Sequence, residues 1–324
     1  MKSRRISAAL TTFWLLAFAA GAAQAQNYPA KPVSIITPSA AGSGPDVIGR
    51  IVAERLSQAW GQQVVIVNRP GAGGVIAGQA VAAAERDGHT LYLAISSTFL
   101  VLPVTQPRLP FDLRRDFAPI GVVGEQPFVV AATPALGVNT LAELVALAKR
   151  RPGELSYTAS NRGTIPHLAG ELLQKRAGFE MTFVPYLGVA KGLHDVMGGR
   201  VSVAVESLSG LAGAIEGKLL KPLAVTSQRR LERLPDVPAV AETFTDFHAT
   251  GWFALMAPSG TPEVILQKVS DDLRAVLENP ELRRRIEAIG TYARPMSRAE
   301  TVAFIAREQE LWQPVVRKIG LTTR

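Results

Sequence analysis

The sequence contains no cysteine among its 324 residues. Disulfide bonds, thiolate metal sites, a cysteine nucleophile and lipidation of an N-terminal cysteine are therefore excluded. A chain of this length buries enough apolar surface to fold without covalent cross-links. Export into an oxidising compartment thus stays compatible with the composition.

Long apolar runs are missing except near the N-terminus. Lys2, Arg4 and Arg5 precede an apolar run from about residue 8 to residue 20, and Ala23-Gln24-Ala25 follows. This order is typical of a secretory signal peptide, and the run is too short to span a bilayer comfortably. We predict a signal peptide over residues 1–25 and a mature, soluble, exported chain.

The signatures of common enzymes are also missing. No G-x-S-x-G nucleophile elbow is present. The run 71–74 lacks the last glycine of a dinucleotide-binding motif, and Gly217-Lys218 lacks the first glycine of a P-loop. The four histidines are not at metal-ligand spacing. We expect no catalysis, no metal and no cofactor, which leaves an exported hydrolase without a nucleophile and base.

The charge balance is mildly basic. The formal net charge is +8, and the predicted signal carries three positive charges and no acids, so the mature chain carries 8 − 3 = +5. The basic residues are scattered, so we expect no nucleic acid partner. The excess fits an acidic small molecule or an anionic membrane surface.

Apolar runs alternate with amphipathic helical patterns along most of the chain, which predicts βαβ units, a largely parallel sheet and the α/β class. Strands are predicted at 33–37, 63–67, 90–95, 119–123, 128–132, 156–158, 181–184, 201–205 and 223–226. The tail is predicted to hold helices only, at 262–278, 280–289 and 298–319.

The alternation falls into two α/β layers, residues 33–105 and about 125–225, and residues 246–258 fit a return crossing. A double crossing places a ligand cleft between two lobes, at the carboxyl ends of strands. We expect a signal peptide at 1–25, a first lobe built from 26–124 plus 248–324, and a second lobe at 125–247.

Residues 33–50 carry the clearest site pattern. A buried strand leads into a turn of small residues at 38–44 and then into a helix with Pro45 at its first position. The first-turn amides of such a helix bind anions. Asp46 is interpreted as structural, because its carboxylate partly competes with an anionic ligand. The loop 68–74 fits a tight turn and a ligand loop equally well, and Ser96, Ser97 and Thr98 are predicted to form a third loop.

The stretch 157–167 repeats this pattern in the second layer. Ser160, Asn161 and Thr164 can donate hydrogen bonds to the far end of a ligand. His167 fits a capping or surface histidine as well as a ligand contact. Glu206 ends the predicted strand 201–205 and either accepts a bond from the ligand or is a salt-bridged or exposed loop acid.

The ordered landmarks of the chain resemble the Bug family, the periplasmic solute-binding receptors of tripartite tricarboxylate transporters. The landmarks are Gly42-Ser43-Gly44-Pro45-Asp46 with Arg50, residues 68–74, Asp87-Gly88-His89-Thr90-Leu91, residues 115–120, Arg151-Pro152-Gly153, residues 184–188, Gly198-Gly199-Arg200-Val201, Leu234-Pro235-Asp236-Val237-Pro238 and residues 257–262.

The resemblance implies a hinged, two-lobed periplasmic binding protein of the type II-like kind, with a mostly parallel sheet flanked by helices in each lobe. In this family backbone amides and waters of first-lobe loops commonly hold a ligand carboxylate. Carried onto this chain, the resemblance implicates the first-lobe residues Ala40, Ala41, Gly42, Ser43, Gly44, Ser96, Ser97 and Thr98, the second-lobe turn with Ser160, Asn161 and Thr164, and Glu206 as the candidate selectivity residue. His167 joins the predicted ligand residues from the residue pattern alone.

Two departures from the family pattern bear on ligand choice. Ser43 stands where many members have glycine, and residues 161–164 replace a small Gly/Ser-rich turn. Arg162 in that turn either contacts a second ligand carboxylate or points to solvent.

The function that the resemblance implies is that of a monomeric receptor. It captures a small carboxylic acid and delivers it to the membrane permease subunits of a tripartite tricarboxylate transporter. The alternative is a ligand sensor that feeds a two-component signalling system.

Overall fold

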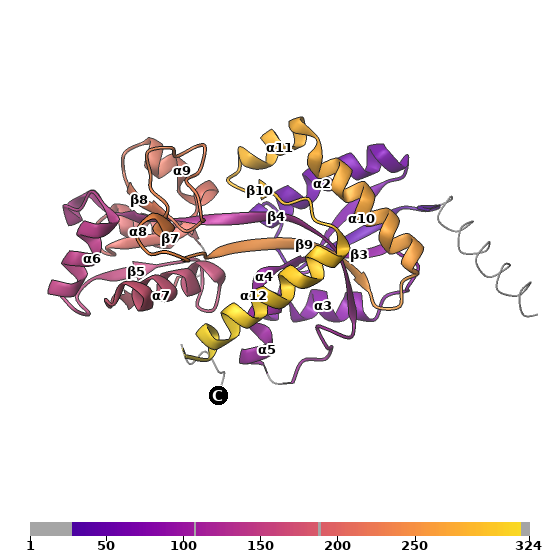
Figure 1. Ribbon diagram of the computed structural model, residues 1–324, viewed down its shortest axis with the longest axis horizontal. Helices are drawn as coiled ribbons and strands as arrows, with labels where there is room; N and C mark the ends of the chain where they lie inside the picture. The colour runs from indigo at the N-terminus through magenta and orange to yellow at the C-terminus, as the bar shows by residue number, and fades with distance from the viewer. Residues whose placement is uncertain (1–27, 107, 187–188, 319–324) are drawn as a thin grey trace, which may run out of the picture.

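The computed structural model describes residues 28–106, 108–186 and 189–318. The predicted signal peptide lies outside the described residues. Figure 1 shows two lobes, one drawn at the right and one at the left, with two long strands running from one to the other. These strands are β4 (Phe117–Ala132) and β9 (Thr250–Pro258).

The first lobe combines the beginning and the end of the chain. β1 (Val33–Thr37) pairs in parallel with β2 (Val64–Asn68) and β3 (Thr90–Ile95). Its helices are α2 (Gly44–Trp60), α3 (Val75–Ala82), α4 (Ser96–Leu100), α5 (Leu102–Thr105), α10 (Glu263–Glu278), α11 (Pro280–Glu287) and α12 (Arg298–Lys318), with the 3-10 turn η1 at Ala72–Gly74.

The second lobe holds the middle of the chain. β5 (Ser156–Thr158) pairs in parallel with β6 (Thr182–Phe183) and β7 (Val203–Ser207), while β8 (Lys221–Val225) pairs with β4. Its helices are α6 (Leu141–Arg150), α7 (Ile165–Ala177), α8 (Val189–Met197) and α9 (Leu208–Glu216), with the 3-10 turns η2 (Pro134–Leu136) and η3 (Val240–Glu242).

The sequence predicts two separate strands at 119–123 and 128–132, and this prediction is wrong because β4 runs through both. β4 pairs antiparallel with β9 up to Pro127 and with β7 from Phe128 onward. Proline has no N–H to give to a ladder, and Pro127 stands where the β9 pairing ends. The sheet order β2-β1-β3-β9-β4-β7-β5-β6 is therefore continuous across the lobes.

The first predicted lobe boundary, 124/125, falls inside β4. The second, 247/248, falls two residues before the start of β9. The division of the chain at these positions stays a prediction. The return crossing placed at 246–258 contains the strand β9, in which every residue is buried.

The tail is not wholly helical, contrary to the prediction. The two-residue strand β10 (Tyr292–Ala293) pairs antiparallel with β4 at Gly124 and Glu125. A Cβ atom on Gly124 would lie 2.8 Å from the Tyr292 carbonyl oxygen, so the absent side chain lets β10 approach. A strand of two residues is too short to show a periodic pattern.

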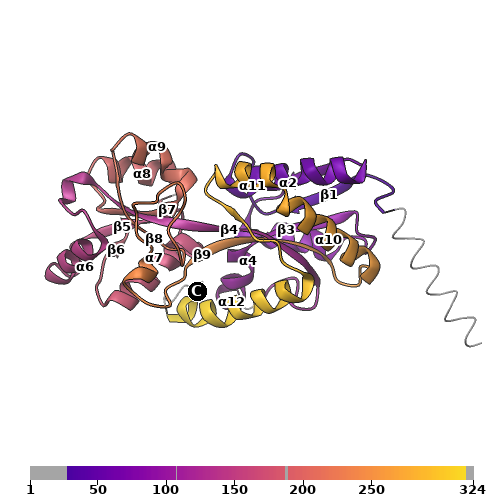
Figure 2. The same ribbon diagram turned by 45° about the horizontal axis from the view of Figure 1, so that its top comes forward.

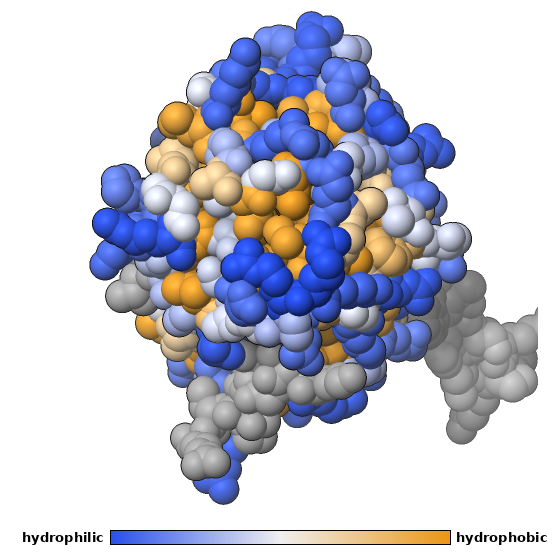
Figure 3. All heavy atoms as spheres, turned by 90° about the vertical axis from the view of Figure 1, so that its left-hand side faces the viewer, coloured by the Kyte–Doolittle hydropathy of each residue, from blue (hydrophilic) through white to orange (hydrophobic). Residues whose placement is uncertain are grey.

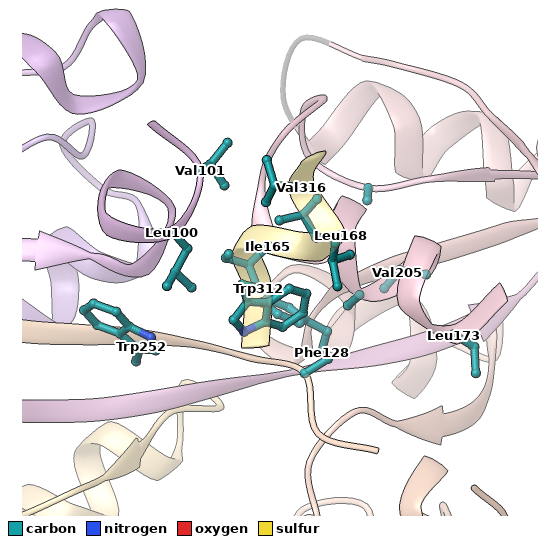
Figure 4. Packing of buried hydrophobic residues seen from close by; sticks show 14 of the residues in the cluster. Leu100, Val101, Phe128, Ile165, Leu168, Leu173, Val205, Trp252, Trp312 and Val316 are labelled. Atoms are coloured by element: carbon teal, nitrogen blue, oxygen red, sulfur yellow. The ribbon is translucent and has the colours of Figure 1, made fainter. Parts of the chain in front are cut away.

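Helix α12 packs across the junction of the lobes. Figures 1 and 2 both show it leaving the first lobe and running toward the second. In Figure 4, Trp312 lies beside Ile165 of α7 and Phe128 of β4. These residues belong to one buried cluster that also holds Trp252 of β9. The apolar core is thus shared by both lobes.

The surface of the second lobe is mixed. Figure 3 looks onto its outer end, where hydrophilic residues lie among apolar ones. Leu219, at 52% exposure, is an exposed large apolar residue of this lobe. Within the described ranges, none of the helices has the length and hydropathy needed to cross a lipid bilayer.

The shared core predicts a large difference between adjacent positions of α12. Trp312 is fully buried, whereas Leu311 is 44% exposed. Trp312→Ala should lower the free energy of unfolding by about 3–5 kcal/mol, because it leaves a cavity at the junction. Leu311→Ala should change it by less than about 0.5 kcal/mol. Urea unfolding followed by circular dichroism measures both, and equal losses would contradict the packing described.

Candidate ligand-binding site

The first turn of the candidate site precedes α2. The N–H and the hydroxyl of Ser43 both donate to the Ala40 carbonyl, at 3.2 and 2.7 Å. Gly42 has φ +78°, a conformation that favours glycine. The Ser43 hydroxyl is directed at the Ala40 carbonyl and makes no capping bond to α2. The first amides of α2, which begins at Gly44 and so one residue before the predicted start, are left for another acceptor.

Asp46 in this first helical turn is structural, as interpreted from the sequence. Its carboxylate is buried and accepts hydrogen bonds from the Gly42 N–H at 2.8 Å, Asn68 Nδ2 at 2.8 Å and Arg50 Nε at 3.0 Å. Burial opposes its ionisation, but the bonds from Arg50, Asn68 and Gly42 outweigh burial and lower the pKa of Asp46. The Gly42 amide is therefore already occupied.

Three first-lobe segments, the turn 38–44, the loop 68–74 and residues 96–98, meet at Gly74. A Cβ atom on Gly74 would lie 2.5 Å from Thr98 Oγ1 and 3.4 Å from Pro38 Cβ. Gly74 also has φ +107°, so glycine is needed at this meeting point. Ser96 and Ser97, predicted in a loop with Thr98, instead start α4, because β3 leads directly into this helix.

The second turn, before α7, is built in the same way. The N–H and the hydroxyl of Thr164 donate to the Asn161 carbonyl at 3.2 and 2.7 Å. Gly163 has φ +81°, and its N–H donates to His167 Nδ1 at 3.2 Å. The Thr164 hydroxyl makes no capping bond to α7 either.

The two turns therefore match position by position. Each has a carbonyl acceptor, a left-handed glycine, an uncapped Ser or Thr, a proline at the second helical position and a side chain that accepts the glycine N–H. The segments are Ala40-Ala41-Gly42-Ser43-Gly44-Pro45-Asp46 and Asn161-Arg162-Gly163-Thr164-Ile165-Pro166-His167. The pattern G-[ST]-x-P recurs in the sequence and could have identified this correspondence.

His167 supports the second turn from inside the protein. The residue is fully buried, and its ring lies 4.1 Å from that of Phe183. Burial, assisted by the Arg162 charge, lowers the pKa of His167 to about 4. The ring is therefore neutral at pH 7, with Nδ1 as acceptor. Contact between His167 and a ligand stays a prediction.

Arg162 makes a contact that the sequence did not indicate. Its guanidinium carbon lies 5.2 Å from the centroid of the Phe183 ring, which is the geometry of a cation–π interaction. The side chain therefore packs against the second lobe at this position.

Glu206 lies inside β7, which extends to Ser207, and it is only 4% exposed. Its carboxylate accepts bonds from the Ser160 N–H at 2.7 Å, from the Ser160 hydroxyl and from the Ser207 N–H at 3.0 Å. Burial raises the pKa of Glu206, and these bonds oppose that rise. Glu206 is thus neither an exposed loop acid nor salt-bridged among the described residues, and it holds the Ser160 backbone in place.

A small cavity beside Glu206 has a volume of about 10 Å³ and is bounded by Ser160, Val189 and Leu211. That volume suits about one water molecule. Two larger cavities, of about 550 and 700 Å³, lie at residues 103–115 with α12 and at the end of the second lobe. Neither contains any of the predicted site residues.

The middle of β4 lies between the start of α2 and β7, the strand whose Glu206 holds Ser160. Gln126 Nε2 lies 3.3 Å from the position that a Cβ atom on Gly44 would take, and Phe128 is the register partner of Ser207. These two β4 residues are about 7 Å apart along the strand. The sequence analysis did not identify Gln126. The feature that could have identified it is its position as a polar residue between two apolar runs.

The arrangement offers hydrogen-bond donors to anions. The N-termini of α2 and α7, one in each lobe, have no capping side chain among the described residues and carry partial positive charge. Among residues 28–106, 108–186 and 189–318, no group of three acidic or histidine side chains is arranged to hold a metal ion.

The chain has relatives of similar length. A family model described as tripartite tricarboxylate transporter family receptor matches residues 48–321. Protein BugT of Bordetella pertussis is 34% identical over 322 residues, which is 99% of each chain. A UPF0065 protein of Agrobacterium vitis is 36% identical over 295 residues, or 90% of this chain and 83% of that protein.

Solved structures share the fold. A Rhodopseudomonas palustris protein with adipate has a TM-score of 0.81 at 31% identity, covering 90% of this chain and 98% of its own. MatC from Rhodopseudomonas palustris, with bound malate, has a TM-score of 0.75 at 26% identity and covers 89% of this chain and 100% of its own. The periplasmic binding protein BugD has a TM-score of 0.77 at 28% identity, with 92% and 100% covered.

The buried neutral His167 predicts a pH dependence of stability. Its pKa in the folded chain, about 4, is below the ordinary value of 6.5, so the unfolded chain takes up the proton first. Stability should fall as the pH decreases from about 6.5 toward 4, by about 2 kcal/mol between pH 7 and pH 5.

The variant His167→Asn keeps an acceptor for the Gly163 N–H but does not titrate. It should lose that part of the pH dependence in urea unfolding at pH 7 and pH 5. His194→Asn is the control, because the His194 side chain is 76% exposed. An unchanged pH slope in His167→Asn would show that His167 is not the titrating group.

Proposed function

This chain belongs to the tripartite tricarboxylate transporter receptor family, a family of periplasmic solute-binding receptors and not of enzymes, and we propose that it captures a small carboxylic acid for such a transporter. The observation that carries the proposal is the pair of matched turns at α2 and α7. Each leaves first-turn amides without a capping side chain, and such amides hold carboxylate oxygens well.

The ligand class that fits best is a dicarboxylic acid. Each lobe contributes one turn. A molecule with an acid group at each end can therefore accept hydrogen bonds from one turn with each of its two carboxylates. The N–H groups of the two turn glycines already donate to side chains of the protein, Asp46 and His167, so the ligand is left with the first amides of each helix. Two relatives of known structure hold adipate and malate, which are both diacids.

Delivery follows from the division of the site between lobes. A ligand that contacts both turns stabilises the arrangement in which the lobes are close, by its differential affinity for that arrangement. We propose that the ligand-loaded, closed receptor docks on the permease subunits of its transporter. In this proposal the mature chain begins after residue 25, works in the periplasm and is monomeric.

A binding panel tests the proposal. Calorimetric titration of the protein from residue 26 onward with adipate, malate, citrate, acetate and adipamide should show binding of at least one diacid. Adipamide, which lacks the carboxylates, should not bind. Proton NMR should show the bound acid recovered unchanged. Failure of every acid to bind, or conversion of one of them, would contradict the proposal.

A charge placed at the start of α2 tests the first turn. Gly44→Asp puts a carboxylate beside the unpaired amides and should weaken binding of the diacid at least about tenfold by repulsion. Gly61→Asp, at the other end of α2, is the control, because a Cβ atom there meets nothing within 4 Å and aspartate tolerates its left-handed φ of +63°. Equal affinities of the two variants would show that the ligand does not bind at α2.

A further inference from the structure

Gln126 is an exception within β4. In the stretch 120–132, all of which the structure describes, every residue is buried except Gln126, which is half-buried. Its neighbour Glu125 is buried and accepts a bond from Arg294 Nη1 at 2.7 Å. The Gln126 side chain therefore lies on a part of the strand that the protein leaves open.

Glycines surround this side chain on two sides. Gln126 Nε2 approaches within 3.3 Å of the site of a Cβ atom on Gly44, and the register partner of Gln126 in β9 is Gly251. A Cβ atom on Gly251 would lie 3.3 Å from the Phe128 ring and 3.7 Å from Ser96 Oγ. Gly44 thus leaves room next to the amide, and Gly251 leaves room next to Phe128 and Ser96 on the neighbouring strand.

The amide of Gln126 has no hydrogen-bond partner among the described residues. Ser96 Oγ nearby accepts the Trp252 N–H at 3.2 Å, which leaves its own proton for another acceptor. A carboxamide has two donors and an acceptor, and those of Gln126 are accessible to solvent and so available to a bound molecule. The Gln126 amide thus lies next to the first residue of α2, where that helix also leaves its first amides without a capping side chain.

We propose that Gln126 is a ligand-contacting residue, whose Nε2 donates to the carboxylate oxygen that the α2 turn holds. The inference rests on the proposed function and adds the residue that connects the ligand to the strand shared by both lobes. Because β4 also pairs with β7 beside Ser207, the bond ties the acid group to the strand that supports the second turn.

Two variants separate the donor from the volume of the side chain. Gln126→Met keeps the size and removes the donors, and it should raise the Kd for the diacid that binds tightest in the wild type by about tenfold. Gln126→Glu removes the donors and adds a charge, so it should raise the Kd by at least about a hundredfold at pH 7.5. The loss of affinity of Gln126→Glu relative to wild type should be smaller at pH 5, because the introduced carboxyl group can donate a hydrogen bond once it is protonated.

The control is Gln267→Glu, on the exposed face of α10, which should bind the same acid within twofold of wild type. Both Gln126 variants binding within twofold of wild type would overturn the inference and leave the proposed function intact. A wild type that binds no acid would overturn both.

A crystal structure of the wild-type protein with that acid keeps the inference testable if a variant fails to fold. The expected result is Gln126 Nε2 within hydrogen-bond distance of a carboxylate oxygen. A bound acid with no contact to Gln126 would overturn the inference.

Discussion

The continuous hydrogen-bonded strand β4 is the constraint on which the rest of the structure depends. Its first part pairs with β9 and its second part with β7 and β8, so the main chains of both lobes are tied to one strand. Gly44 approaches this strand at Gln126, and β7 leaves it at Phe128. The start of α2 and the strand that holds Ser160 through Glu206 thus contact β4 two residues apart.

Buried polar bonds fix the helix that lies across this junction. Glu308 of α12 accepts hydrogen bonds from Trp252 Nε1 at 3.1 Å and Trp312 Nε1 at 3.2 Å. Burial raises the pKa of Glu308, the charge on His248 opposes the rise and that on Glu125 adds to it. Both indole N–H groups would be buried without a partner if Glu308 were absent, so this acid orients α12 over β9.

The matched turns share their backbone chemistry and differ in their supporting side chains. In the first, an ionised and hydrogen-bonded Asp46 accepts the glycine amide, and in the second a neutral His167 does so. The supporting acid of the first turn is therefore negatively charged and paired with Arg50, whereas the supporting histidine of the second is neutral and that turn carries the positive charge of Arg162. The same turn thus gives the two lobes unequal electrostatic environments for the two ends of a ligand.

Local sequence determined the α/β class, most strands of both lobes and the glycine–proline turns before α2 and α7, because periodicity and helix-start chemistry depend on near neighbours. It also excluded disulfides, since the chain has no cysteine. The tertiary structure alone decided that β4 is one strand, that Ser96 starts a helix and that Glu206 is buried. It alone brought Gln126 beside Gly44, because strand pairing and burial depend on residues far away along the chain, whose positions no local pattern records.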